Sequence, residues 1–217
     1  MDRFKVNKRK NETIKFLILK LKLLNKNRLI AGVDEVGRGS WIGPVFSAAV
    51  ILKKNINKNL LKDSKKIPAK ERKQLANYIK KNSIYSVGKA SIKEIDKLNI
   101  LQATLLSMKR AINNLKYKPK IILVDGTHAP KNMGYHFKTI IRGDEKIPAI
   151  SAASIIAKVA RDRYITRLAK NYISYGWHTN FGYGTKKHLN AINKFGVTIH
   201  HRKSFKPMHN ILLDKKK

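Results

Sequence analysis

Short apolar segments bounded by glycine or proline recur along the chain from residue 29 onward. Runs of this length and setting are typical of buried β-strands. The segment 83–92 differs, because its apolar positions alternate with polar ones, as in a strand with two unlike faces. The pattern therefore predicts strands over residues 29–34, 44–52, 83–92, 119–125 and 136–143.

Helical periodicity appears between and after these strands. Apolar positions at helical spacing predict long helices over 92–115 and over 151–170, with Ser151 as the N-cap of the second. A shorter helix is predicted over 185–196, where Gly196 ends it. Three early strands followed by alternating strands and helices predict an α/β fold whose sheet mixes antiparallel and parallel pairs.

The net charge sets this chain apart from an ordinary globular domain. Its 217 residues are 42% hydrophobic, enough for a real core, yet 48 Lys and Arg against 13 Asp and Glu give a formal charge of +35. A polyanionic partner is the usual physical reason for such an imbalance, and we expect nucleic acid. An anionic membrane surface and a lysine-rich coding bias are the alternatives.

Three segments are expected: a basic extension over 1–28, one domain over 29–207 and a basic tail over 208–217. The extension has helical spacing and could be a nucleic-acid arm, a membrane-surface helix or a plain tail, and we favour the arm. Lys20 and Lys22 interrupt its apolar runs, so no membrane span is expected. The absence of cysteine excludes disulfides and thiolate chemistry and fits a cytoplasmic protein, which we expect to be a monomer.

Carboxylates stand at the ends of several predicted strands. Asp34, Asp125 and Asp144 each follow an apolar or strand-like run beside a glycine or a turn, and Glu35 adjoins the first. Strand ends in α/β sheets share the edge where ligands bind, so these acids are predicted to converge. Oxygen ligands without His or Cys favour Mg²⁺ or Mn²⁺ over zinc. Two such ions about 3.5–4 Å apart promote in-line attack on a phosphodiester.

Each acid also has a simpler interpretation. A single Asp at a strand end is more often a turn former than a ligand, so Asp125 and Asp144 carry little weight alone. The pair at 34–35, followed directly by Gly-Arg-Gly at 37–39, is harder to explain as a turn. Asp162 is predicted to be a helical charge pair, and Asp63 a loop or capping residue.

Seven motifs together resemble the bacterial ribonuclease HII family, the type 2 ribonucleases H. They are GVDEVGRGSWIGPVFSAAVIL, LKDSKKI, EIDKLNILQATLLSM, ILVDGTHAP, RGDEKIPAISAASIIAKVARDRY, YGTKKHL and HHRKSF, and they span roughly residues 29–207. The resemblance implies a ribonuclease H-like core with a helical C-terminal part. It also implies cleavage of RNA in RNA–DNA hybrids and 5′ of single ribonucleotides in duplex DNA, leaving 3′-hydroxyl and 5′-phosphate ends.

The resemblance also assigns expected roles to individual residues. It implies that the acids Asp34, Glu35, Asp125 and Asp144 bind two Mn²⁺ or Mg²⁺ ions. It implies that the Gly-Arg-Gly loop contacts the ribose 2′-hydroxyl and its phosphate, and that a tyrosine stacks on the next deoxyribose. It further implies a phosphate-binding loop. The residues implied to contact nucleic acid are Gly37, Arg38, Gly39, Ser64, Lys65 and Tyr183.

The chain departs from the family pattern in two places. Ser40-Trp41 stands where proline and a small aliphatic residue are more usual, and WHTNFGYGT lacks the usual lysine before the tyrosine. The sister type 3 enzymes generally carry a lysine in place of Arg38 and a large N-terminal domain, so type 2 is preferred. Two alternatives stay open: a non-catalytic nucleic-acid binder, and another nuclease on the same fold, such as a Holliday-junction resolvase.

Overall fold

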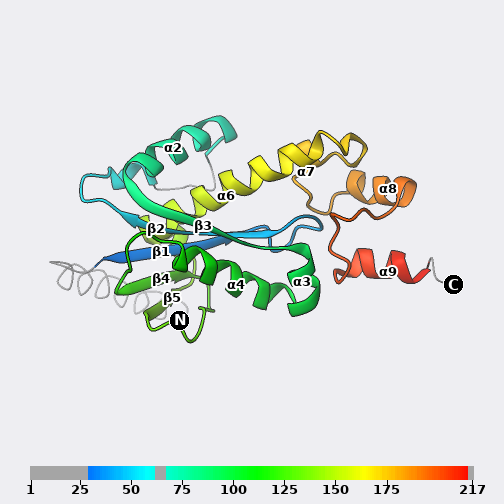
Figure 1. Ribbon diagram of the computed structural model, residues 1–217. Helices are drawn as coiled ribbons and strands as arrows, with labels where there is room; N and C mark the ends of the chain where they lie inside the picture. Colours follow the sequence, from blue (N-terminus) through cyan, green and yellow to red (C-terminus); the bar gives the residue numbers. More distant parts are fainter. Residues whose placement is uncertain (1–28, 62–66, 215–217) are drawn as a thin grey trace, which may run out of the picture.

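A computed structural model of the chain describes residues 29–61 and 67–214. Within this part, five strands form one sheet in the order β3-β2-β1-β4-β5 (Figure 1). The strand bounds are β1 Ile30–Val36, β2 Val45–Leu52, β3 Ser83–Ala90, β4 Ile121–Asp125 and β5 His136–Ile140. β1, β2 and β3 pair antiparallel, whereas β4 is parallel to both β1 and β5. The predicted mixed sheet is therefore confirmed.

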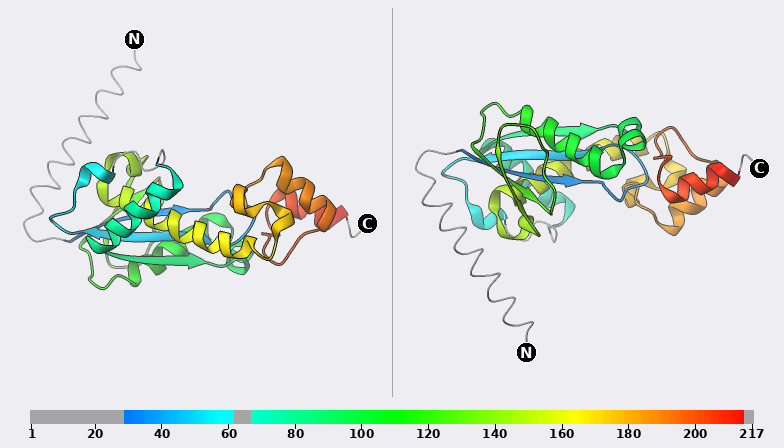
Figure 2. Two further views of the ribbon diagram at one scale, coloured as in Figure 1. Left: turned by 90° about the horizontal axis from the view of Figure 1, so that it is seen from above. Right: turned by 90° about the horizontal axis from the view of Figure 1, so that it is seen from below.

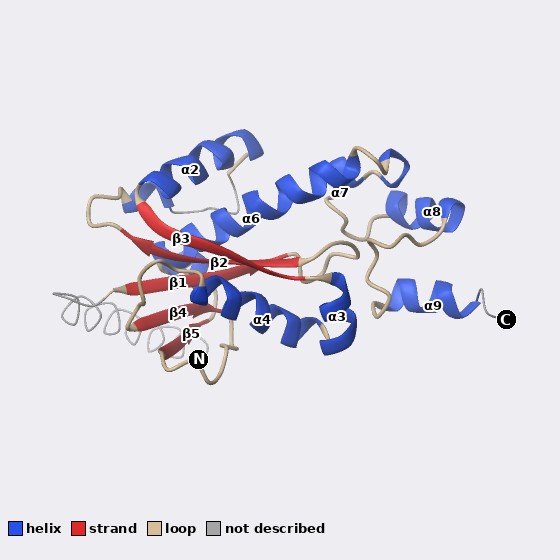
Figure 3. Ribbon diagram, viewed as in Figure 1, coloured by secondary structure: helices blue, strands red, loops and turns tan. Residues whose placement is uncertain are grey.

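Helices cover both faces of this sheet and extend one end of the molecule (Figures 1 and 3). The α-helices are α2 Ala69–Lys81, α3 Ile92–Leu98, α4 Ile100–Asn113, α5 Gly143–Lys146, α6 Pro148–Ala169, α7 Trp177–Asn180, α8 Lys186–Phe195 and α9 Lys206–Asp214. Two 3₁₀ turns, η2 Lys58–Leu61 and η4 Ile173–Tyr175, complete the description. No helix among the described residues is both long and apolar enough to cross a membrane.

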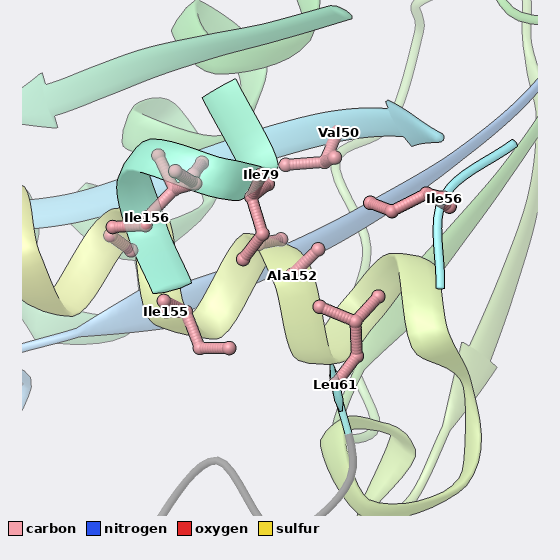
Figure 4. Packing of buried hydrophobic residues seen from close by; sticks show 11 residues of the cluster. Val50, Ile56, Leu61, Ile79, Ala152, Ile155 and Ile156 are labelled. Carbon is pink, nitrogen blue, oxygen red and sulfur yellow. The ribbon is translucent and has the colours of Figure 1, made fainter. Parts of the chain in front are cut away.

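Strand β2 packs against helices on both faces of the sheet. Its alternate residues Ala48 and Val50 pack with α2 and α6, where Val50 lies near Ile79 (Figure 4). Ala49 and Ile51 point the other way and pack with α4 and β4. A strand buried on both faces needs apolar residues at consecutive positions, which accounts for the apolar run from Ala48 to Leu52.

The C-terminal helices gather at one end of the sheet, around the last turns of α6 (Figure 2). Their own core contains the fully buried side chains of Ile165, Trp177 and Met208. Helix α9 crosses residue 207, where the sequence analysis ended the domain, so the packed part of the chain continues beyond that residue. The predicted helical C-terminal part is confirmed, whereas the extension over 1–28 lies outside the described residues.

Two helix predictions were wrong in detail. The single helix expected over 92–115 is broken at Asn99, whose φ of 70° ends α3 and whose side chain accepts a hydrogen bond from the backbone of Gln102 to cap α4. Ser151 does not cap α6, because the helix begins earlier, at Pro148, a residue suited to a first turn. Ser151 is buried instead, and its hydroxyl donates to the carbonyl of Leu61.

Candidate active site

The four acids selected from the sequence line a single pocket of about 300 Å³. Asp34 and Glu35 lie inside β1, which continues to Val36, so the expectation that this strand ends at Asp34 was wrong. Asp125 is the last residue of β4. The parallel pairing of β1 with β4 reaches the residues just before Asp34 and Asp125, which places these two residues next to each other on neighbouring strands where that pairing ends.

Asp144 reaches the pocket by a different route from the one predicted. Strand β5 ends at Ile140, and Asp144 lies beyond it in the short helix α5, where its side chain is buried. The backbone N–H of Gly143 donates a 2.6 Å hydrogen bond to Oδ1 of Asp125. This hydrogen bond joins the start of α5 to the end of β4. Asp144 is therefore positioned by a contact between α5 and β4, and it does not lie at the end of a strand.

Helix α6 forms another wall of the pocket, with Ser154 and Lys158 one turn apart. The helix can lie this close to β1 because Gly32 has no side chain: a Cβ there would stand 2.1 Å from the carbonyl carbon of Ala149. The sequence analysis did not select Ser154 or Lys158. Their spacing of four residues places them on one face of the predicted helix, which was an available signal.

Arg72 of α2 also lines the pocket, and no sequence signal pointed to it because α2 itself was not predicted. Asp162 lies 2.9 Å from Nζ of Lys158 and 3.9 Å from Nη1 of Arg72. The prediction that Asp162 is a helical charge pair is therefore confirmed, and its partner is one turn earlier in α6 and not a sequence neighbour.

The carboxylates of this pocket repel one another. Burial raises the pKa of Asp34 well above its usual value, and the charges of Glu35 and Asp125 raise it further, while a hydrogen bond with Ser154 acts in the opposite direction. Burial likewise raises the pKa of Glu35, although the nearby charge of Arg38 lowers it. Two acids whose ionised forms are disfavoured in this way are suited to binding a cation.

The chemistry of the donor set fits a divalent metal ion. The side chains that could serve as ligands in the pocket are carboxylates and one hydroxyl, which suits a hard cation that prefers oxygen. Among the described residues, no three His, Asp or Glu side chains already surround one point as ligands. The carboxylates therefore fit such an ion by type and location, and their side chains would have to move to coordinate it.

The Gly-Arg-Gly loop lies beside this pocket, where β1 ends. Gly37 has a φ of 92°, and a Cβ there would stand 2.2 Å from Nε of the buried Arg161. Nη1 of Arg38 lies 3.4 Å from Oε1 of Glu35, and the Arg38 side chain is 48% exposed. Arg202, also buried, donates to the carbonyl oxygen of Arg38 at 2.8 Å. Two buried arginines thus lie against the loop, and one of them, Arg202, is hydrogen-bonded to the backbone of the exposed Arg38.

Tyr183 faces the other glycine of the loop. A Cβ on Gly39 would meet Cε1 of the Tyr183 ring only at 4.0 Å, with nothing closer. The tyrosine is 36% exposed, and the guanidinium of Arg161 lies 5.3 Å from its ring centre. The structure thus brings the loop and the tyrosine together, whereas Ser64 and Lys65 lie outside the described residues.

A mixed sheet of this order, flanked by helices and extended by a helical C-terminal part, defines a ribonuclease H-like fold. Among solved structures, the ribonuclease H2 of Pyrococcus horikoshii OT3 matches with a TM-score of 0.72 at 28% identity, covering 87% of this chain and 99% of that one. The ribonuclease HII of Archaeoglobus fulgidus, solved in a complex with PCNA, matches with a TM-score of 0.67 at 29% identity, covering 80% and 93%.

Sequence comparison narrows this class to one family. The ribonuclease HII family model matches residues 31–208, and the chain belongs to that family. The ribonuclease HII of Pelagibacter ubique (strain HTCC1062) is 58% identical over 185 residues, which cover 85% of this chain and 100% of that protein. The Coxiella burnetii (strain Dugway 5J108-111) ribonuclease HII is 49% identical over 188 residues, covering 86% and 93%. The chain is thus a type 2 ribonuclease H, a phosphodiester hydrolase, and the binder and resolvase alternatives are set aside.

Proposed function

We propose that this enzyme cleaves RNA within RNA–DNA hybrids and cleaves 5′ of single ribonucleotides embedded in duplex DNA, leaving 3′-hydroxyl and 5′-phosphate ends. The observation that carries the proposal is the position of the acidic pocket, which contains Asp34 and Glu35, beside the loop whose Gly39 faces Tyr183. A phosphodiester held at the loop would place its phosphate over the carboxylates. Residues 34–39 would thus contribute both to cleavage, through two carboxylates, and to recognition of the sugar, through the loop.

The carboxylates of Asp34, Glu35, Asp125 and Asp144 would hold two Mg²⁺ or Mn²⁺ ions. When bound, such ions supply an activated water and neutralise the leaving 3′ oxygen. The chain contributes fixed carboxylates: Asp34 accepts a 2.7 Å hydrogen bond from the backbone N–H of Glu35, and Asp125 accepts one from Gly143. Lys158 and Arg72, which line the same pocket, would attract the phosphate.

Recognition of the ribonucleotide would come from the loop and the tyrosine. Backbone groups of Gly37 and Gly39 would reach the 2′-hydroxyl, the group that distinguishes RNA from DNA. Arg38 would bind the adjacent phosphate, and the exposed ring of Tyr183 would stack on the deoxyribose that follows. Ser64 and Lys65 would bind a second phosphate. The formal charge of +35 supports this proposal, because a strongly positive protein attracts the phosphate backbone of a nucleic acid.

The decisive experiment compares two end-labelled duplexes that differ in one sugar, a single ribonucleotide in one and its all-DNA twin in the other. With Mg²⁺ or Mn²⁺, we expect a single cut 5′ of the ribonucleotide, a product that a ligase can reseal, and no cut in the twin. EDTA should abolish cleavage. Cleavage of the twin, or a cut on the 3′ side of the ribonucleotide, would contradict the proposed function.

A further inference from the structure

His188 of α8 is fully buried and contacts the main chain of Tyr183. Its Nδ1 lies 3.0 Å from the carbonyl oxygen of Tyr183. On the other side of the ring, Nε2 accepts a 3.0 Å hydrogen bond from Nε1 of Trp177 and lies 3.2 Å from Nε2 of His201. Every polar atom of this imidazole is thus engaged inside the protein, so the ring has a structural task and no contact with solvent.

These contacts fix where the protons are. An indole N–H can only donate, so Nε2 of His188 is an acceptor and Nδ1 carries the proton that goes to the Tyr183 carbonyl. In His201, Nδ1 accepts the backbone N–H of Thr198 at 2.9 Å, which leaves the proton on Nε2, directed at His188. Both rings are neutral in this arrangement, and burial lowers the pKa of each.

The same ring lies against the segment that follows the Gly-Arg-Gly loop. Trp41 is 5.2 Å from His188, ring centre to ring centre. The backbone N–H of Trp41 donates to the carbonyl of Gly182 at 2.8 Å, and the hydroxyl of Ser40 donates to the same oxygen at 3.0 Å. The departure from the family pattern at Ser40-Trp41 therefore falls where the loop and the tyrosine segment are joined.

The Tyr183 side chain itself has little to hold it. It is 36% exposed, and the guanidinium of Arg161 packs over its ring. Its direction is therefore set mainly by its backbone, whose N–H donates to Asn180 at 2.9 Å and whose carbonyl accepts from His188. Losing the second bond would leave the carbonyl without its buried donor and free the residue to turn.

We propose that His188 is a positioning residue: it holds Tyr183 at the distance from Gly39 that a ribonucleotide–deoxyribonucleotide junction requires. His201 and Trp177 fix the tautomer that makes this possible. The inference rests on the proposed function, because it assumes that Tyr183 reads the junction. His188 is fully buried and does not line the acidic pocket, so it should affect the choice of substrate much more than the chemical step.

The matched variants are His188→Asn and His188→Gln. The amide nitrogen of asparagine stands where Nδ1 stands and can still donate to the Tyr183 carbonyl, whereas glutamine places its amide near Nε2. The readout is the rate on a single-ribonucleotide duplex divided by the rate on a continuous hybrid. We expect His188→Gln to lower this ratio about fivefold to tenfold, the value of one lost hydrogen bond, and His188→Asn to keep it.

A double-mutant cycle tests whether His188 acts through the tyrosine. His188→Gln should lower the ratio in the wild-type background and should lower it no further in the Tyr183→Ala background, where the ring that it positions is absent. Additive losses would overturn the positioning role, as would equal ratios for the asparagine and glutamine variants. If Tyr183→Ala alone leaves the ratio unchanged, the proposed function fails at the junction, which is a different outcome.

His201 provides a second route if a His188 variant does not fold. His201→Gln keeps an amide donor near the position of Nε2, and His201→Leu removes it. Thermal unfolding of each variant establishes that it is folded before its ratio is measured. We expect the leucine variant to lower the ratio and the glutamine variant to keep it; the same ratio in both, with folded proteins, would overturn the tautomer argument.

Discussion

The guanidinium of Arg38 lies 3.4 Å from the carboxylate of Glu35, so the proposed phosphate contact is paired in the free protein with one of the four pocket acids. The arginine is half exposed, and an ion pair of this kind contributes little to stability. Arg38 can therefore leave Glu35 at small cost when a phosphate arrives. The ion pair between Arg38 and Glu35 is thus a weak contact between the loop and the pocket.

Replacing Arg38 should weaken substrate binding without removing the chemistry. Arg38→Ala loses a charge-assisted contact of about 1.5–3 kcal/mol, which raises the Kd for a single-ribonucleotide duplex about 10- to 150-fold. Arg38→Lys keeps the charge but not the forked geometry and should lie in between. Fluorescence anisotropy in Ca²⁺ buffers measures the Kd. An unchanged value for the alanine variant would remove Arg38 from the interface.

Asp34→Asn should abolish turnover and stabilise the metal-free protein. Because burial and neighbouring charges raise the pKa of Asp34 in the folded state, its ionised form opposes folding at neutral pH, and the amide relieves that repulsion. We expect activity to fall by several orders of magnitude and the Tm in EDTA to rise. Asp162→Asn is the control, since it breaks an ion pair with Lys158 and should lower the Tm. Substantial activity of Asp34→Asn in saturating Mg²⁺ would contradict its role.

The two loop glycines should respond differently to alanine. Gly37→Ala places a side chain at positive φ and against Arg161, so the free energy of unfolding should drop by about 1–3 kcal/mol or more. Gly39→Ala adds a methyl group whose nearest neighbour would be the Tyr183 ring at 4.0 Å, so the Tm should stay unchanged, yet the surface that the loop presents beside Tyr183 becomes bulkier. Its cleavage at single ribonucleotides should fall while metal binding persists. If Gly39→Ala keeps the wild-type ratio of the rate on a single-ribonucleotide duplex to the rate on a continuous hybrid, Gly39 does not contact the ribonucleotide.

Tyr183 should matter for its ring and much less for its hydroxyl. Tyr183→Phe keeps the stacking face and the contact with Arg161, so its rates should stay close to wild type. Tyr183→Ala should reduce cleavage at single ribonucleotides more than cleavage within long hybrids, because only the former depends on a deoxyribose directly after the junction. Parallel time courses on both substrates measure this difference. Equal losses on the two substrates would argue for a purely structural tyrosine.

Stability should fall in mild acid because of the buried histidines. Burial lowers the pKa of His201 to about 3 from its usual 6.5, so between these values the unfolded chain binds a proton that the folded protein excludes. The free energy of unfolding should therefore decrease as the pH falls below 6.5, by up to about 1.4 kcal/mol per pH unit for each such group. His188 and His200 act in the same direction, whereas the raised pKa values of Asp34 and Glu35 act in the opposite one.

Urea unfolding in EDTA at pH 7 and pH 5 measures this loss, and His201→Gln should show a smaller one. The ring-proton NMR signal of His201 provides an independent test, because it should not titrate above pH 5. A titration midpoint of His201 near pH 6.5 in the folded protein would show that the ring takes up a proton at that pH. It would contradict the assignment of His201 as a neutral ring that donates to His188.

The sequence by itself determined which segments form the five strands, which four acids gather in one pocket, and the family. Buried strands need unbroken apolar runs, and a pair of acids followed by Gly-Arg-Gly has few other uses, so both features are visible in the order of residues alone. The helix over 151–170 was visible because its apolar positions recur at helical spacing. Its first turn was not, because Pro148 and Ser151 are both acceptable helix starts, and packing against Gly32 and Leu61 decided between them.

Only the tertiary structure decided how distant segments meet. Asp144 reaches the pocket through the hydrogen bond between Gly143 and Asp125, and Arg72 comes from a helix with too few buried residues to reveal itself. The link from His201 through His188 to Tyr183 spans residues that share no sequence pattern. Such contacts depend on distances between elements, which are set by packing of the whole chain, and local periodicity carries no information about them.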